Sequence, residues 1–284
     1  MRKGVIFIIV VLMTISFLGE IKNGEGIETT EKITKNTLSR LDDGDFTHTV
    51  FVEYATATWC SACPTASEAM YKVYQEGNYS MFFITLVGDK NPIAKDRMRK
   101  YHTIAVPTVY FDGGYSLKVG HSGDVNATVR DYKNLIEKCG DRRVKKVDVS
   151  TNVIWVKDEE IKVDVRVSNP TPQIYIGRVR SYITEVESRW VDYKGNNYHF
   201  ALLDSAVDEP VVLMPFGEKK FISTWNSSHA SKNQVFNGLT SNNTMVISVV
   251  TNWVPHPRMG YRGIRYKQVF LAFFVDDVDA ATPS

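Results

Sequence analysis

Two cysteines stand three positions apart in residues 59–64, which have the sequence Trp-Cys-Ser-Ala-Cys-Pro. The chain has three cysteines in all, so the closeness of Cys60 and Cys63 points to a shared role. A thiolate is a nucleophile, and two neighbouring thiols can act in turn on a disulfide. In that chemistry Cys60 attacks the substrate disulfide, and Cys63 then attacks Cys60 and releases the substrate. The spacing therefore predicts a redox-active pair.

The flanking residues predict the elements that position this pair. Residues 49–54 form a mostly apolar, β-prone run, as expected of a strand buried on both faces. Pro64 suits the first turn of a helix, and the apolar pattern continues that helix to Tyr74. A helix N-terminus stabilises negative charge, so we expect the thiolate of Cys60 there, with its sulfur exposed.

Further elements follow in the same segment, which we place at residues 46–140. The order of its elements, β-α-β-α-β-β-α, is typical of a layered α/β domain. After the first strand and helix we expect strands at 81–87, 108–111 and 115–119, and helices at 94–101 and 125–136.

This segment, about a third of the chain, resembles the thioredoxin-fold thiol–disulfide oxidoreductases in two stretches that occur in the family's order, 59–64 and 101–114. The resemblance implies a three-layer α/β domain with a central mixed sheet. It also implies that Pro107 is a cis-proline facing the dithiol, against the alternative of a trans proline that opens a strand. The backbone of Val106 would then pair with an extended substrate segment, and Trp59 would shield the dithiol and pack against substrate.

Glu53 is the only charged residue in the first apolar strand. Related enzymes place an acid near this point, beneath the dithiol. A buried carboxyl has a raised pKa and can relay the proton of Cys63. The alternative is an acid at the strand end that is exposed to water.

In the second segment, residues 144–280, the spacing of apolar residues changes to the two-residue period of β-strands. Residues 161–168 alternate apolar and polar side chains, the pattern of a half-buried strand. Several short strands without a long helical stripe predict an all-β, immunoglobulin-like sandwich. The other strand-like runs are 174–186, 198–203, 220–225, 244–251 and 268–275.

The N-terminus predicts export. Arg2 and Lys3 precede the apolar run Val5–Leu18, so residues 1–19 have the form of a signal peptide or a membrane anchor, and both alternatives stay open. Residues 20–45 are polar and predict a tether. We therefore expect an extracytoplasmic protein, secreted or anchored to the membrane.

Together these observations predict an exported thiol–disulfide oxidoreductase that acts on protein disulfides and exchanges electrons with a donor or acceptor protein. Ser61 and Ala62 stand where strongly oxidising relatives have a histidine, so we favour a reductase or isomerase over a strong oxidase. The alternative is a cell-surface binding or adhesion protein, in which the sandwich recognises a partner and the Cys60–Cys63 disulfide is static.

Other classes of function find less support in the sequence. A net charge of +2 without a basic block argues against nucleic-acid binding. No histidine has metal-ligand spacing to the cysteines, so we expect no metal and no cofactor. Copper handling by Cys60, Cys63 and His121 is the weakest alternative. Cys139 lies on a helical apolar stripe, which predicts a buried free thiol.

Overall fold

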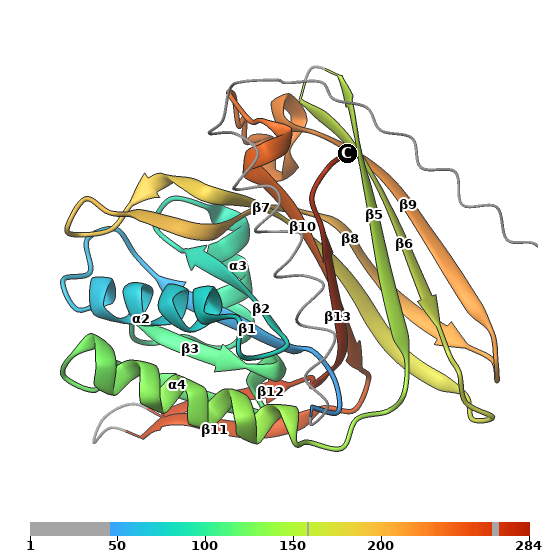
Figure 1. The fold of residues 1–284 in the computed structure, drawn as a ribbon, viewed down its shortest axis with the longest axis horizontal. Coiled ribbons are helices and arrows are strands. Elements are labelled where there is room, and N and C mark those ends of the chain that lie inside the picture. Colours follow the sequence, from blue (N-terminus) through green and yellow to red (C-terminus); the bar gives the residue numbers. More distant parts are fainter. Residues whose placement is uncertain (1–45, 158, 263–266) are drawn as a thin grey trace, which may run out of the picture.

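A computed structural model describes residues 46–157, 159–262 and 267–284 (Figure 1). The predicted signal peptide or anchor (1–19) and tether (20–45) lie outside the described residues. Within the described part, no helix is long and apolar enough to cross a membrane.

The first half of the described chain alternates strands and helices. Strands β1 and β2 are parallel, and every residue of both is buried, which explains their continuous apolar sequences. Strands β3 and β4 continue the sheet in antiparallel fashion. The elements are β1 (Val50–Thr56), α2 (Cys63–Glu76), β2 (Met81–Val87), α3 (Pro92–Lys100), β3 (Thr108–Phe111), η1 (Asp112–Gly114), β4 (Ser116–Val119) and α4 (Val125–Gly140).

The second half contains strands and three short 3-10 turns. Its two longest strands, β7 and β8, form a hairpin. The elements are β5 (Asp148–Lys157), β6 (Glu160–Ser168), β7 (Tyr175–Val191), β8 (Asn197–Leu213), β9 (Glu218–Asn226), η2 (Ser227–His229), η3 (Ser231–Asn233), η4 (Ser241–Asn243), β10 (Thr244–Asn252), β11 (His256–Arg262), β12 (Lys267–Ala272) and β13 (Val275–Ala281).

The predicted fold class, a three-layer α/β domain followed by an immunoglobulin-like sandwich, is wrong. The structure is mostly β and is dominated by one mixed sheet of eight strands in the order β13-β10-β7-β8-β2-β1-β3-β4. The halves join where β2 runs beside β8: Thr85 pairs with Ala201, and its hydroxyl donates to the His199 carbonyl at 2.7 Å. The boundaries proposed for the two segments stay predictions.

Side chains from the two halves of the chain also pack together. One hydrophobic core contains buried residues from β1, β2, α2 and α4 together with residues from β7, β8, β10 and β13. The ring of Phe51 in β1, for example, stacks on that of Tyr182 in β7, with centroids 5.8 Å apart. A second core lies between the β13-β10-β7-β8 part of the large sheet and the three-stranded sheet β5-β6-β9.

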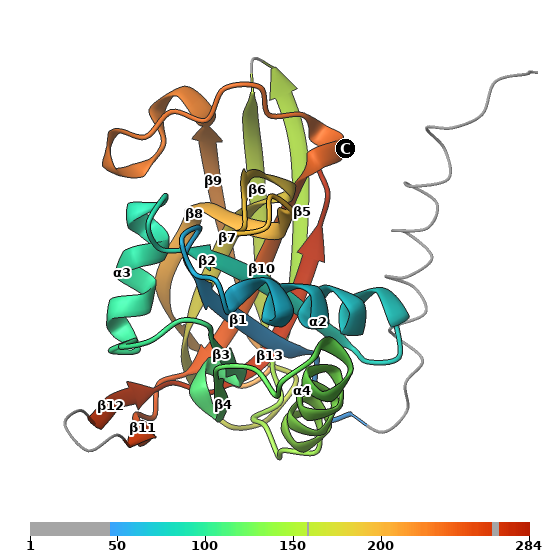
Figure 2. The same cartoon turned by 90° about the vertical axis from the view of Figure 1, so that its left-hand side faces the viewer.

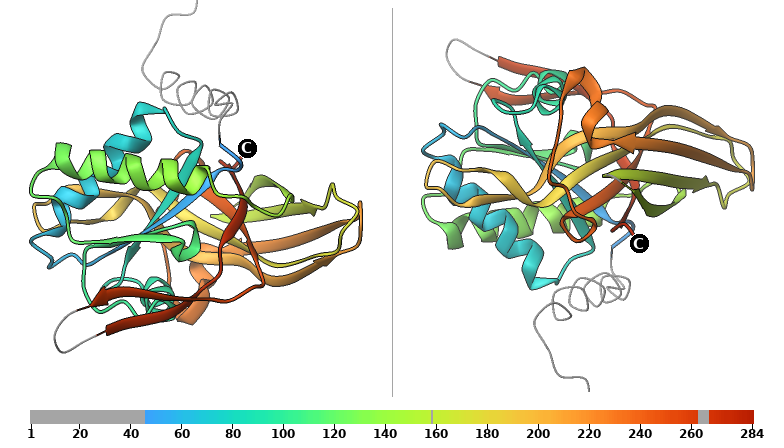
Figure 3. Two further views of the ribbon diagram at one scale, coloured as in Figure 1. Left: turned by 90° about the horizontal axis from the view of Figure 1, so that it is seen from below. Right: turned by 90° about the horizontal axis from the view of Figure 1, so that it is seen from above.

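The helices cover one end of the large sheet, and the three-stranded sheet covers the other (Figure 3). Helices α2 and α4 lie on one face of strands β1–β4, and α3 lies on the opposite face (Figure 2). The hairpin β11–β12 packs on the α3 side, where Phe270 contacts the rings of Tyr101 and Tyr110. These two faces decide which side chains reach the cysteine pair.

Candidate functional site

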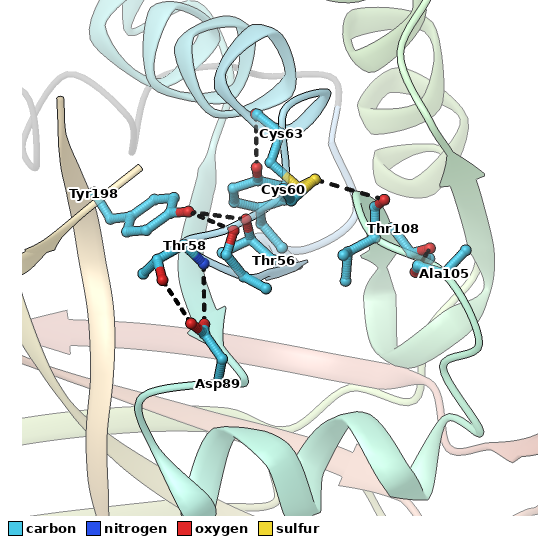
Figure 4. The surroundings of a disulfide bond; sticks show 11 residues. Thr56, Thr58, Cys60, Cys63, Asp89, Ala105, Thr108 and Tyr198 are labelled. Atoms are coloured by element: carbon cyan, nitrogen blue, oxygen red, sulfur yellow. Dashed lines mark hydrogen bonds between the residues drawn. A yellow bond between two sulfur atoms is a disulfide. The ribbon is translucent and has the colours of Figure 1, made fainter. Parts of the chain in front are cut away.

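Cys60 and Cys63 form a disulfide at the start of α2, with their Cα atoms 5.4 Å apart (Figure 4). Backbone hydrogen bonds shape this turn: the N–H of Cys60 donates to Ala57 at 3.1 Å, and that of Cys63 donates to Cys60 at 3.2 Å. Helix α2 has Pro64 in its first turn, no side-chain cap and no acidic residue there. Within its first turn no carboxylate therefore balances the partial positive charge of the helix N-terminus.

The structure buries both cysteines, with 5% of Cys60 and none of Cys63 exposed. The expected exposed sulfur at Cys60 is not observed, because Ala57 and Val106 pack against the pair. The Cys60 sulfur lies 3.7 Å from the Val106 carbonyl oxygen. A disulfide sulfur carries no hydrogen, so this is a contact in the oxidised protein, whereas a Cys60 thiol could donate to the same oxygen.

The Val106–Pro107 segment lies beside the disulfide, although 43 residues separate Cys63 from Val106 by their sequence numbers. The peptide bond between the two residues is cis, as the resemblance implied for Pro107. Two hydrogen bonds fix the segment, one from the N–H of Gly120 to the Pro107 carbonyl (2.8 Å) and one from the Thr108 hydroxyl to the Ala105 carbonyl (2.8 Å). The structure thus brings Val106 and Pro107 to the cysteines.

Trp59 is 67% exposed and lines a cavity of about 320 Å³ instead of covering the disulfide. The cavity opens beside the disulfide, because Ala57 and Val106, which pack on the sulfurs, also line it. Its lining combines apolar side chains with two cationic side chains from α3, one carboxylate and two threonines. The lining residues are Thr56, Ala57, Trp59, Gly88, Asp89, Lys95, Met98, Arg99, Thr103 and Val106.

Glu53 does not lie at the cysteine pair, which corrects both interpretations of this residue. Neighbouring side chains of β1 point to opposite faces of the sheet. Tyr54 faces α2, where its hydroxyl donates to the Cys63 carbonyl at 2.8 Å. Glu53 therefore faces α3, and it is completely buried there. It is neither exposed to water nor placed to relay the proton of Cys63.

The Glu53 carboxylate is held instead in an ion pair. Arg97 donates to both of its oxygens, at 2.6 and 2.8 Å, and the Tyr101 hydroxyl donates to one of them. Burial alone would lower the pKa of Arg97, but the adjacent Glu53 carboxylate more than offsets this and raises it well above its usual value. Arg97 therefore stays charged, and the pair fastens α3 to β1.

Sequence reasoning missed the side chains that hold the loop before Trp59. The Asp89 carboxylate accepts hydrogen bonds from the N–H and the hydroxyl of Thr58, at 3.0 and 2.6 Å. The Tyr198 hydroxyl donates to the Ala57 carbonyl at 3.2 Å, and burial raises the pKa of Tyr198 to about 12, so the hydroxyl keeps its proton (Figure 4). Tyr198 belongs to β8, so only the joined sheet brings it here.

The described residues contain no group of three or more histidine, cysteine, aspartate or glutamate side chains that could hold a metal ion. Cys139 is a buried free thiol, and burial raises its pKa.

Comparison with known proteins shows a similar fold but identifies no family for this chain. No family model matches the chain, and no curated protein matches it. The fold is similar to that of HBP35 of Porphyromonas gingivalis, at 13% identity and a TM-score of 0.56, over 84% of this chain and 76% of that one. Two further structures are too distant to carry an argument. A protein from Agrobacterium tumefaciens has 15% identity and a TM-score of 0.47, over 84% of this chain and 95% of that one. Thioredoxin-2 of the malaria parasite has 25% identity and a TM-score of 0.25, over 30% of this chain and 82% of that one.

Proposed function

We propose that this protein is a thiol–disulfide oxidoreductase that acts on protein disulfides through Cys60 and Cys63. Its chemistry would be that of the thioredoxin family. The observation that carries the proposal is the position of the disulfide at the start of α2, against Val106 and beside an open cavity. A static structural disulfide needs neither a neighbouring cavity nor an exposed aromatic side chain at its rim.

The proposed reaction starts from the dithiol. The Cys60 thiolate attacks one sulfur of a substrate disulfide, and the other substrate sulfur leaves as a thiolate. The Cys63 thiolate then attacks the Cys60 sulfur, which forms the internal disulfide and releases the second substrate sulfur. Two electrons pass from the pair to the substrate, and a donor protein must restore the dithiol.

Three features of the site support this reaction. The N-terminus of α2 favours the thiolate of Cys60, because no acidic side chain in the first turn opposes it. The Val106–Pro107 segment lies against Cys60, so the backbone of Val106 is placed to pair with a substrate segment beside that sulfur. The cavity between Trp59 and Val106 can receive a substrate segment next to the residues that pack on Cys60, of which 5% is exposed. We propose a reductase or isomerase direction, since Ser61 and Ala62 add no cationic group.

Trapping of substrates tests the proposal. A Cys63→Ser variant cannot resolve the mixed disulfide, so it should retain partner proteins through Cys60 as adducts that dithiothreitol releases. A Cys60→Ser variant should trap none, and a Cys139→Ser variant should behave as the parent protein. If Cys63→Ser traps no more than Cys60→Ser, the proposal is wrong.

A second candidate is a cell-surface binding or adhesion protein whose Cys60–Cys63 disulfide is static. The burial of Cys60, with 5% exposed, favours it. Under this alternative the β-rich half recognises a partner, and the disulfide stays intact in cells and resists mild reductants. The same trapping experiment distinguishes the two candidates, because a static disulfide yields no adducts.

We further propose that the protein acts outside the cytosol, secreted or held by its N-terminal segment, because an oxidising compartment preserves disulfide substrates. Cell fractionation, with the N-terminal sequence of the mature protein, tests this. Recovery of the intact chain from the cytosol would contradict it.

A further inference from the structure

A second cavity, of about 360 Å³, lies on the side of the sheet where Glu53 is buried. It is enclosed by α3, β7 and the segments around the β11–β12 hairpin, and α3 turns a different face to it than to the cavity beside the disulfide. Its size is in the range of small-molecule sites. The lining residues are Arg97, Lys100, Tyr101, His102, Gly113, Arg180, Leu271 and Phe273.

Cationic side chains outnumber acidic ones around this cavity. The Glu53 carboxylate is fully engaged by Arg97 and Tyr101. The remaining carboxylate, Asp208, is the partner of three cations: Arg178 through its Nε, Arg180 with its Nε at 3.0 Å, and Lys100 with its Nζ at 4.0 Å. Four cations against two carboxylates leave an excess of two positive charges.

Arg180 is the least satisfied of these cations. Its side chain is 12% exposed, and within the described parts of the chain its Nε has no hydrogen-bond partner, because the contact with Asp208 is not aligned for one. A mostly buried guanidinium N–H that is not aligned with an acceptor is only partly satisfied by its ion pair, which costs free energy. The position of this guanidinium group beside an open cavity is explained if a ligand with a hydrogen-bond acceptor binds there.

Among the described residues, Lys100 also lacks a close acceptor for its charged group. Partial burial lowers the pKa of its ammonium group, and the positive charges of Arg180 and Arg97 lower it further, although 57% of the side chain is exposed. Its Nζ is too far from Asp208 for a hydrogen bond. A negatively charged group between Lys100 and Arg180 would satisfy both side chains at once.

We propose that this cavity binds a small molecule that carries two or more oxyanion groups, carboxylate or phosphate. Its anionic groups would accept hydrogen bonds from Arg180 and Lys100, and its remaining part would pack on Leu271 and Phe273. Guanidinium groups suit both kinds of oxyanion. The volume of about 360 Å³ and the modest net charge of the chain favour a small ligand over a polymer.

Calorimetric titration of the full chain at low ionic strength tests this proposal, with citrate and pyrophosphate as probes. At least one probe should bind with a stoichiometry of one, and added salt should weaken the binding. Arg180→Met and Lys100→Met should each weaken it about tenfold, as expected for a lost charge-assisted hydrogen bond. Lys162→Met, on the exposed face of β6, makes the same charge change elsewhere and should leave binding unchanged.

Binding of citrate alone would identify the ligand's oxyanions as carboxylates, and binding of pyrophosphate alone would identify them as phosphates. The proposal is overturned if neither probe binds at millimolar concentration, or if both cavity variants bind as the parent protein does. Because 57% of the Lys100 side chain is exposed, Lys100→Met tests the site even where Arg180→Met does not fold.

Discussion

Removing the charge of Glu53 should destabilise the protein and leave its thiol chemistry unchanged. In a Glu53→Gln variant, the buried Arg97 guanidinium loses the carboxylate that accepts two of its hydrogen bonds, and an amide N–H₂ group faces cationic donors. Breaking a buried ion pair in this way costs about 3–5 kcal/mol. The free energy of unfolding typically falls by about 1–3 kcal/mol per molar urea, so the urea concentration at the unfolding midpoint should fall by about 1 M or more.

A double variant, Glu53→Gln with Arg97→Met, removes both charges and should recover part of this loss. Unfolding is followed by circular dichroism, and exchange of the cysteine pair with oxidised glutathione is followed at several pH values. Both variants should show the parent's exchange rate and pH profile, because Glu53 and the disulfide lie on opposite faces of β1. A parent-like midpoint with slowed exchange or a shifted pH profile would refute this reasoning and restore Glu53 as a proton relay.

Three further predictions concern other parts of the fold. Burial raises the pKa of Asp277 to about 6, above its value of about 3.9 in an unfolded chain, so stability should fall as pH rises from about 4 to about 6. In urea titrations at each pH, Asp277→Asn should reduce this loss, and the part that remains is expected from Asp276 and Asp279, whose pKa values burial also raises. Tyr198→Phe removes the bond to the Ala57 carbonyl and should speed reduction of the disulfide by dithiothreitol several-fold, whereas an unchanged rate would mean that β8 does not restrain the loop. Lys95 lines the cavity beside the disulfide, so Lys95→Met should slow reduction of cystine peptides with acidic flanks more than neutral ones, by about two- to fivefold in kcat/KM at low salt.

Local patterns predicted the elements around the cysteines well, because each depends on a few neighbouring residues. Strand β2 spans the predicted residues 81–87, and β3 spans 108–111. Pro64 lies in the first turn of α2, and the amphipathic stretch from residue 125 is α4. The pairing of Cys60 with Cys63 follows from the same short-range information.

The joined sheet could not be predicted in this way. Alternation identifies a strand but not its partner, and the pairing of β8 with β2 links positions far apart in sequence, Thr85 and Ala201. Register shifts within the β7–β8 hairpin also interrupt the alternation that a strand prediction needs. The sequence pattern changes between the two halves, whereas the hydrogen bonds between β2 and β8 join strands of both halves into one sheet.

The error at Glu53 has a related cause. Alternation along β1 places Glu53 and Tyr54 on opposite faces, and this was visible in the sequence. The sequence does not state which face carries α2, because that depends on tertiary packing. Likewise, the burial of Cys60 depends on Val106, whose approach is set by the β1–β3 pairing.

The reduction potential of the Cys60–Cys63 pair tests the central proposal most directly. The purified protein, with Cys139→Ser to leave one redox couple, is equilibrated in glutathione buffers, and the thiols are counted by alkylation and mass spectrometry. A redox-active pair should titrate between about −270 and −120 mV, the range of known thiol–disulfide oxidoreductases. A potential below about −300 mV, typical of structural disulfides, would contradict the account.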